Sequence, residues 1–410
     1  MIIRIGEKKY PTESCINLFV AGLLLLPLYI DLFAALSEVV GFSTTVTTSI
    51  YYISLWALLL LAIPTIVKAL NKNVIIAGAF VVGGLLLHYS VYSDSGEYIW
   101  GSDPMAIFTF SPQTLLAAVP YMLIGLAVTD MRKLGDILHS VARIGIVFGA
   151  LSYIVTISAG LELQYDDMNQ AYAVCVMNCI LITGYRKYDA FFLIAGVLSN
   201  VLAGTRGAIV ALLVAILLKL VLLQTNKRKK ALGVTGSAAA IILMNTKLPE
   251  IILGGVSDLF AAFGVAELRL VDYARDGLLM DTAGRDDIMR TLMDKVWENP
   301  VFGYGLGADR SFTKNEMYAH NMVVEMWIAF GLVLGTVIVA WMGYRLFKAM
   351  TKTEKTTCML IAGLFSSVVI KLLFSSSFIY SKELFLLLGL CLATATEKTT
   401  NSDITHEDIK

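Results

Sequence analysis

Long apolar segments alternate with short polar ones along the 410 residues of the chain. A helix crosses the hydrocarbon core of a bilayer with about 20 apolar residues. On this criterion we predict about twelve transmembrane helices, at residues 15–36, 50–68, 73–90, 113–129, 138–158, 170–184, 188–203, 207–223, 231–245, 321–347, 356–374 and 380–396. The sixth, seventh and ninth segments are short, and their prediction is the weakest.

Composition supports a membrane protein. The chain is 57% hydrophobic and 16% charged, with a mean hydropathy of +0.73, whereas soluble domains carry about 25% charged residues. We therefore expect an all-α polytopic membrane protein whose partner is the lipid bilayer. The formal net charge is zero, so the chain has no overall electrostatic attraction to nucleic acid.

The five cysteines all fall inside apolar segments, at Cys15, Cys175, Cys179, Cys358 and Cys391. We interpret them as small core residues and expect no disulfide framework. Cys175 and Cys179 are four residues apart, but no histidine or cysteine pair accompanies them, so the sequence favours no metal site.

Lysine and arginine are concentrated in every second connection between the predicted spans. These basic stretches are the N-terminus with Arg4, Lys8 and Lys9, then residues 68–72, 132–133, 186–187, 227–230 and 345–355. Cytoplasmic loops are rich in lysine and arginine. We therefore predict that both ends of the chain are cytoplasmic, in a bacterial inner membrane, and that the first apolar run is an uncleaved transmembrane helix.

One outer connection is far longer than the others. We divide the chain into residues 1–245 with nine transmembrane helices, a large outer loop at 246–320, three more helices within 321–396, and a cytoplasmic tail at 397–410. A loop of this length in a compact protein is usually functional. We therefore place the catalytic elements there.

The stretch "GRDDIMRTLMDKVWENP" within this loop has the pattern of an amphipathic helix. Its apolar residues recur at helical spacing, and charged residues occupy the other face. Asp286 and Asp287 favour the amino end of a helix, and Pro300 ends it. We predict a helix that lies on or near the outer membrane surface.

Three polar residues at the predicted outer face are candidates for chemistry. His320 can exchange a proton near neutral pH, although an ordinary interfacial histidine explains its position as well. Arg206 lies between two apolar runs and Arg285 opens the amphipathic stretch. A guanidinium suits a phosphate, but helix capping or a surface salt bridge also accounts for each arginine.

Weaker candidates surround these three. The glycines of "GYGLG" do not have the spacing of a nucleotide-binding loop, and we interpret them as a tight, close-packed turn. Asp166 and Asn169 belong to an outer loop that is either solvated or able to hold a hard metal. Glu325 either orients a neighbouring group or faces a polar cavity. Tyr304 and Asn321 complete the supporting set.

Several motifs together resemble the O-antigen polymerase and ligase superfamily. "NPVFGYGLG" followed by "HNMVVEMWIAFGLVLG" resembles its carboxy-terminal signature of glycines, then His-Asn before an apolar helix. "GTRGA" is similar to its S-R-G-A turn, with Thr205 in place of the commoner serine. "AGRDDIM" and "DDMNQAYA" are similar to two further motifs, in the family's order.

The resemblance implies a GT-C-like membrane glycosyltransferase that needs no metal or other cofactor and acts on the periplasmic face. Its donor would be a glycan on undecaprenyl pyrophosphate, and its acceptor another glycan or the lipid A-core. Carried over to this chain, His320 would be the general base, and Arg206 and Arg285 would bind the pyrophosphate. A chain-length regulator protein is a possible partner.

Three functions remain open at this stage. We favour a polymerase that joins lipid-linked repeat units, since the chain is compact. The alternative within the family is a ligase that moves a finished glycan onto the lipid A-core. A transporter is the alternative from another class, but the sequence has no clear internal repeat of the kind common in transporters.

Overall fold

The computed structural model describes residues 2–5, 8–42, 72–92, 115–159, 167–223, 285–313 and 318–407, together with scattered short stretches between 46 and 67, at 99 and between 228 and 258. The predicted spans at 50–68 and 231–245, and residues 246–284 of the outer loop, therefore fall largely outside the described residues.

The described part of the chain is helical apart from one hairpin. The helices are α1 (Thr12–Val40), α3 (Lys72–Val91), α5 (Leu115–Leu126), α6 (Met131–Ser158), α7 (Asp167–Thr183), α8 (Asp189–Leu202), α9 (Arg206–Leu223), α13 (Arg285–Glu298), α14 (Ala308–Phe312), α15 (Met322–Thr351), α16 (Lys355–Leu364), α17 (Ile370–Phe374) and α18 (Lys382–Glu407). A π-helical turn at Phe365–Val369 joins α16 to α17, and a 3-10 turn at Phe378–Tyr380 precedes α18. Strands β1 (Ile2–Ile5) and β2 (Lys8–Pro11) pair antiparallel, with Ile2 opposite Pro11.

The expectation of a membrane protein with many helices is confirmed at a coarse level. Four helical segments of the described chain are long and apolar enough to cross a bilayer: Cys15–Val40, Met131–Ser158, Met322–Thr351 and Lys355–Phe374. Gly78–Val91, Gln170–Thr183 and Asp189–Leu202 are shorter apolar helices. The predicted total of about twelve transmembrane helices stays a prediction.

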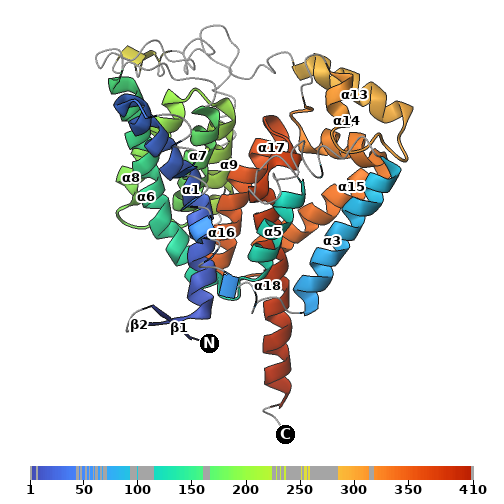
Figure 1. Cartoon of the computed structure of the whole chain (residues 1–410), viewed down its shortest axis with the longest axis horizontal. Coiled ribbons are helices and arrows are strands. Elements are labelled where there is room, and N and C mark those ends of the chain that lie inside the picture. The colour runs from blue at the N-terminus through green and yellow to red at the C-terminus, as the bar shows by residue number, and fades with distance from the viewer. Residues whose placement is uncertain are drawn as a thin grey trace.

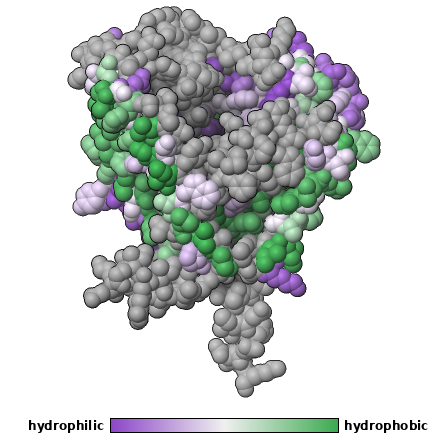
Figure 2. Space-filling view, in the orientation of Figure 1, coloured by the Kyte–Doolittle hydropathy of each residue, from purple (hydrophilic) through white to green (hydrophobic). Residues whose placement is uncertain are grey.

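The helices form an elongated bundle with two unlike ends. The β1–β2 hairpin and the carboxyl end of α18 lie at one end, while α13 and α14 lie at the opposite end (Figure 1). Hydrophobic side chains cover much of the flanks, and hydrophilic ones gather around α13 and α14 (Figure 2). This arrangement agrees with a topology in which the outer loop lies opposite both chain ends.

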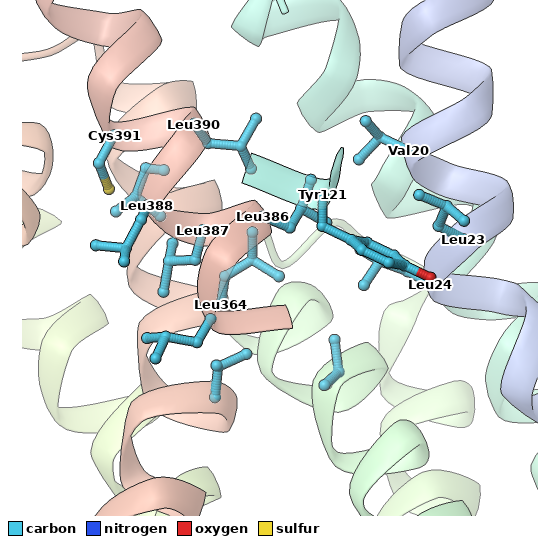
Figure 3. Packing of buried hydrophobic residues seen from close by; sticks show 14 of the residues in the cluster. Val20, Leu23, Leu24, Tyr121, Leu364, Leu386, Leu387, Leu388, Leu390 and Cys391 are labelled. Carbon is cyan, nitrogen blue, oxygen red and sulfur yellow. The ribbon is translucent and has the colours of Figure 1, made fainter. Parts of the chain in front are cut away.

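The core is formed by α1, α5, α6, α7, α15, α16 and α18. Figure 3 shows part of it, with residues of α1, α5, α16 and α18 labelled. Val20 of α1, Leu364 of α16 and Leu387 of α18 are almost completely buried in it. Of the five cysteines, Cys15 is partly buried and the other four are buried, all as free thiols. The interpretation of the cysteines as core residues is thus confirmed for the four buried ones.

The helices α5 and α18 approach each other through a pair of glycines. A Cβ atom on Gly125 would lie 2.5 Å from the carbonyl oxygen of Leu386. A Cβ atom on Gly389 would lie 2.1 Å from the carbonyl oxygen of Met122. Since both neighbours are backbone atoms, no side-chain movement can relieve the overlap, and only glycine permits this separation of the two helices.

We predict that Gly389→Ala destabilises the protein, although alanine is the better helix former by about 1 kcal/mol. The new methyl group forces the helices apart, at a cost on the order of 1–3 kcal/mol. Thermal unfolding in detergent, followed by size-exclusion chromatography, measures the effect. The control is Gly343→Ala in α15, where nothing lies within 4 Å of the added Cβ; equal melting of the two variants would contradict the prediction.

Candidate active site

The loop that holds the three glycines is built into a break in α15. Gly331 has φ 77° and ψ 164°, so α15 is interrupted there. The predicted span at 321–347 is present as the apolar segment Met322–Thr351, with this break inside it. The Tyr304 amide donates to the carbonyl of Ile328 at 2.7 Å, and the Leu332 amide donates to the carbonyl of Pro300 at 2.6 Å. The loop therefore pairs backbone groups that the broken helix leaves free.

Close approach explains the glycines on both sides of this contact. A Cβ on Gly303 would lie 2.4 Å from the Gly331 amide nitrogen, and one on Gly331 would lie 2.4 Å from the Val301 carbonyl oxygen. Gly303, Gly305 and Gly307 all have positive φ, at 72°, 97° and 78°. The interpretation of "GYGLG" as a tight, close-packed turn is confirmed.

The carboxyl end of α3 holds the same loop, a role that the sequence did not suggest. The Leu306 amide donates to His88 Nε2 at 3.1 Å, and the Tyr92 hydroxyl donates to the carbonyl of Phe302 at 2.8 Å. The His88 ring also packs against Phe330, with ring centroids 5.0 Å apart. The only feature of the sequence that could have indicated this role was a histidine, His88, at the end of an apolar segment.

The predicted amphipathic helix is present as α13, and it ends at Glu298, just before Pro300. Its Leu292 and Val296 are buried against Val324 and Ile328 in the first part of α15. The apolar face of α13 thus packs against α15, and this packing determines the position of the amino end of α13. The placement of the helix at a membrane surface stays a prediction.

The three main candidates all lie at the amino ends of helices. Arg206 is the first residue of α9, Arg285 is the first residue of α13, and His320 lies two residues before α15. A tight turn with Gly204 at φ 67° precedes Arg206. The amino end of a helix carries partial positive charge and binds anions. A guanidinium there is unfavourable for the isolated helix and favourable for an anionic ligand.

His320 has a strained backbone and an unpaired ring nitrogen. Its φ is 52°, and within the described ranges it is the one residue other than glycine with a positive φ. This conformation costs about 1–2 kcal/mol for an L-residue, and such strain is found at functional sites. Its side chain is buried, and its ring centroid lies 4.1 Å from that of Tyr318. Its Nδ1 has no hydrogen-bond partner among the described residues.

The surroundings of His320 keep its imidazole neutral. Burial lowers the pKa of His320 to about 4, and the charges of Arg285 and Arg310 act in the same direction. A hydrogen bond with the backbone of Ser375 acts in the opposite direction. The ring is therefore an unprotonated base at neutral pH, and Arg285 lies close enough to influence it.

Three side chains around His320 bind the carboxyl end of α17. The Asn321 side-chain amide donates to the carbonyl of Leu373 at 3.3 Å. Arg285 donates to the carbonyl of the next residue, Phe374, and the Tyr318 hydroxyl donates to that of Ser375 at 3.2 Å. The last carbonyls of a helix have no partner within the helix, so this end holds the candidate residues together.

Tyr172 of α7 links Arg206 to this cluster. A Cβ on Gly207 would lie 2.4 Å from the Tyr172 hydroxyl oxygen, so the amino end of α9 lies beside this tyrosine. The same hydroxyl is within hydrogen-bonding distance of Ser375 and interacts electrostatically with Arg285. The structure thus places Arg285 near His320, and it places the turn that carries Arg206 against Tyr172, a neighbour of Arg285.

A buried ionic network lies behind His320. Arg310 of α14 pairs with Asp309 at 2.7 Å and with Glu325 at 3.5 Å, and it donates to Ser377 Oγ at 3.1 Å. Glu325 also accepts hydrogen bonds from Ser377 Oγ and, at 2.9 Å, from the Phe378 amide. Each charged side chain here is at least nine-tenths buried. The network ties α14 and α15 to the connection between α17 and α18.

Two further contacts connect this network to the histidine. Asp309 accepts a hydrogen bond at 2.8 Å from the amide of Ala319, the residue before His320. The Arg310 guanidinium lies over the Tyr318 ring, 5.7 Å from its centroid. The network therefore fixes both the backbone and the ring that flank His320. Arg310 was not among the candidates from the sequence, although the Asp-Arg pair that begins two residues after the third glycine could have indicated it.

The supporting candidates have different outcomes. Asn321 caps α15, since its Oδ1 accepts from the amide of Val323 at 2.9 Å. Glu325 orients neighbouring groups, as described above. Tyr304 packs edge-on against Phe312 and contributes its amide to the helix break. Asn169 lies in α7, but its side chain is outside the described atoms, and Asp166 is outside the described residues.

We predict that Arg310→Met destabilises the protein by roughly 3–5 kcal/mol, because it leaves two buried carboxylates without their cation. Loss of the unfolding transition, or its shift to lower denaturant concentration, measures the effect. Arg290→Met is the matched control, since Arg290 is an exposed arginine on α13. The prediction is contradicted if both variants unfold at the same denaturant concentration.

One comparison with known proteins gives a match that covers these residues. A family model described as O-antigen ligase matches residues 190–340. The match includes the turn at Arg206, helix α13 with Arg285, the glycine loop and the amino half of α15 with His320. The comparison with curated proteins gives no match. The chain thus carries an O-antigen ligase family domain at residues 190–340, which confirms its resemblance to the O-antigen polymerase and ligase superfamily.

Proposed function

We propose that this protein is a membrane glycosyltransferase that joins oligosaccharide repeat units carried on undecaprenyl pyrophosphate, at the periplasmic face of the inner membrane. The observation that carries the proposal is His320, which lies near Arg285 and inside the residues that match the family. Its buried Nδ1 has no partner in the part of the chain that the structure describes. Ligation of a finished glycan to the lipid A-core is the second candidate, favoured by the description of the matched family as O-antigen ligase.

The proposed reaction is a direct displacement. His320 takes the proton from an acceptor hydroxyl while the hydroxyl oxygen attacks the anomeric carbon of the donor sugar. The bond between that carbon and the phosphate oxygen breaks, and undecaprenyl pyrophosphate leaves with the bonding electrons. His320 afterwards gives the proton to solvent. A single displacement inverts the anomeric centre.

Arg206 and Arg285 bind the pyrophosphate in this proposal. Each opens a helix, so the guanidinium and the free backbone amides of the first turn favour the same anion. They stabilise the negative charge that develops on the phosphate oxygen as the bond breaks. Arg285 is held by the carbonyl of Phe374 at the end of α17, which orients it before the substrate binds.

The binding of pyrophosphate would also activate His320. The pKa of the free enzyme's imidazole is about 4, which gives a neutral but weak base. A bound pyrophosphate places negative charge among the cations that help to lower this pKa. The negative charge favours the protonated imidazole, so the pKa of His320 rises toward neutrality when the donor is in place, and the base becomes stronger when it is needed.

A gene deletion complemented by variants tests the function. We predict that lipopolysaccharide from the deletion strain shows core with a single repeat unit if the protein is a polymerase. Bare core with long glycan left on undecaprenyl pyrophosphate would instead identify a ligase. Wild type restores the lost product, and His320→Asn does not, because its amide cannot take a proton. A general base contributes about 10²–10⁴-fold to the rate.

Asparagine is chosen because it removes the base and is compatible with the backbone conformation at this position. Asparagine tolerates the left-handed backbone conformation that His320 adopts, so the variant is expected to fold. Its amount in the membrane, measured by immunoblotting, is the control for folding. Full rescue by a stably expressed His320→Asn protein would overturn the proposed mechanism, and unchanged lipopolysaccharide or other surface glycan in the deletion strain would overturn the function.

The proposed base also predicts a particular pH dependence. The acidic limb of kcat/KM reports the free enzyme, so we expect it near the lowered pKa of His320, about 4, and not near 6.5. The acidic limb of kcat reports the enzyme with bound donor and should lie at higher pH. Steady-state assays with purified protein and lipid-linked donor between pH 3.5 and 8 measure both. A common limb near pH 6.5 would contradict the assignment.

A further inference from the structure

Lys371 is a cation inside an apolar segment, and the proposed mechanism does not use it. It lies in α17, two residues after the π-helical turn Phe365–Val369, within the membrane-spanning stretch Lys355–Phe374. Its residue surface is partly buried. Ionisable residues in such segments are costly and usually functional, so the lysine requires a specific explanation.

In the described part of the chain, no anion is paired with Lys371. Its ammonium makes no ion pair with the described residues and donates no hydrogen bond to them. Its closest interaction is with the ring of Tyr172, whose centroid lies 4.5 Å from the Lys371 Nζ atom. Glu383 attracts it only at longer range, and Lys382 opposes that attraction. A cation–π contact compensates for part of the lost hydration, and a bound anion would compensate for more.

The contact with Tyr172 places Lys371 at the proposed pyrophosphate site. The charge of Arg285 acts on the same tyrosine hydroxyl, and the amino end of α9, which begins with Arg206, lies against it through Gly207. One aromatic side chain is therefore the common neighbour of two cations and of the helix end that carries a third. A site that assembles positive charge in this way fits a ligand with several negative charges.

The π-helical turn explains how a lysine of this helix reaches the site. A π turn adds one residue to a helix, and one residue corresponds to a rotation of about 100° about the axis. The residues after Val369 are thereby turned relative to those of α16. Both the π turn and α17 contact α9, and the π turn also contacts α7, the helix of Tyr172. Such turns are frequent at functional sites.

The main structural alternative is that Lys371 stabilises the carboxyl end of α17. A lysine in the last turn of a helix interacts favourably with the helix dipole. However, the last carbonyls of α17 already accept hydrogen bonds from Asn321, Arg285 and Tyr318. The helix end is thus satisfied without the lysine ammonium, which faces Tyr172.

We propose that Lys371 binds the diphosphate of the lipid-linked donor, as a third cation beside Arg206 and Arg285. This inference rests on the proposed function and adds a residue to its donor site. The ammonium forms charge-assisted hydrogen bonds with the phosphate oxygens, and these bonds replace or supplement its contact with the Tyr172 ring. Lys371 then contributes to donor affinity and to the charge balance of the leaving group.

The test is binding of undecaprenyl pyrophosphate to the full-length protein in lipid nanodiscs, measured by microscale thermophoresis. We expect Lys371→Met to weaken binding about tenfold or more, the usual effect of removing a charge-assisted hydrogen bond. Lys371→Arg, which keeps the charge, should bind within about threefold of wild type. Lys348→Met is the matched control: Lys348 also lies in the last turn of a helix and contacts a tyrosine ring. We expect it to bind like wild type.

A second measurement uses the unaltered protein and does not depend on how the variants fold. An amine-reactive reagent modifies accessible lysines, and mass spectrometry gives the rate at each. Undecaprenyl pyrophosphate should slow the modification of Lys371 and leave that of Lys348 unchanged. Wild-type-like binding by Lys371→Met, or an unprotected Lys371 in a protein that binds the lipid, overturns this inference and leaves the proposed function standing. Failure of the wild type to bind the lipid overturns the proposed function itself.

Discussion

The candidate site depends on one constraint, that backbone amides and carbonyls buried in a membrane protein need hydrogen-bond partners. Gly331 interrupts α15 and leaves such groups free, and the glycine loop pairs with them. The end of α17 leaves further carbonyls free, and side chains from α13 and from the approach to α15 pair with those. The loop, the broken helix and the helix end therefore hold one another in place.

Charge is arranged around this backbone framework in two groups. In the first group, the cation of Arg310 is buried with the carboxylates of Asp309 and Glu325, and this network holds the residues that precede the strained His320. In the second group, Arg285, Lys371 and the amino end of α9 have Tyr172 as a common neighbour. The first group is internally paired, whereas the second collects positive charge that favours an anionic ligand.

Patterns that are local in the sequence predicted their structures well. The amphipathic helix α13 follows from apolar spacing and ends before Pro300, as expected. "GYGLG" forms the predicted tight turn, because glycines so close together are typical of backbone that bends sharply. The break at Gly331 was not predicted, since an apolar run with one glycine has the same pattern as an intact helix. The roles of Arg310 and Lys371 were not predicted for a related reason: Arg310 also binds Ser377, and Lys371 contacts Tyr172, and both of these residues are distant in the chain.

The sequence by itself determined the class of the protein, its many apolar helices, the residues with suitable chemistry and the family they resemble, because these depend on composition, periodicity and short motifs. Only the tertiary structure decided which candidates meet. His320 and Arg285 are brought together by the end of α17, more than fifty residues beyond the histidine. Such a contact arises when helices pack together and the free carbonyls at a helix end accept hydrogen bonds from distant side chains. Neither process produces a local pattern in the sequence.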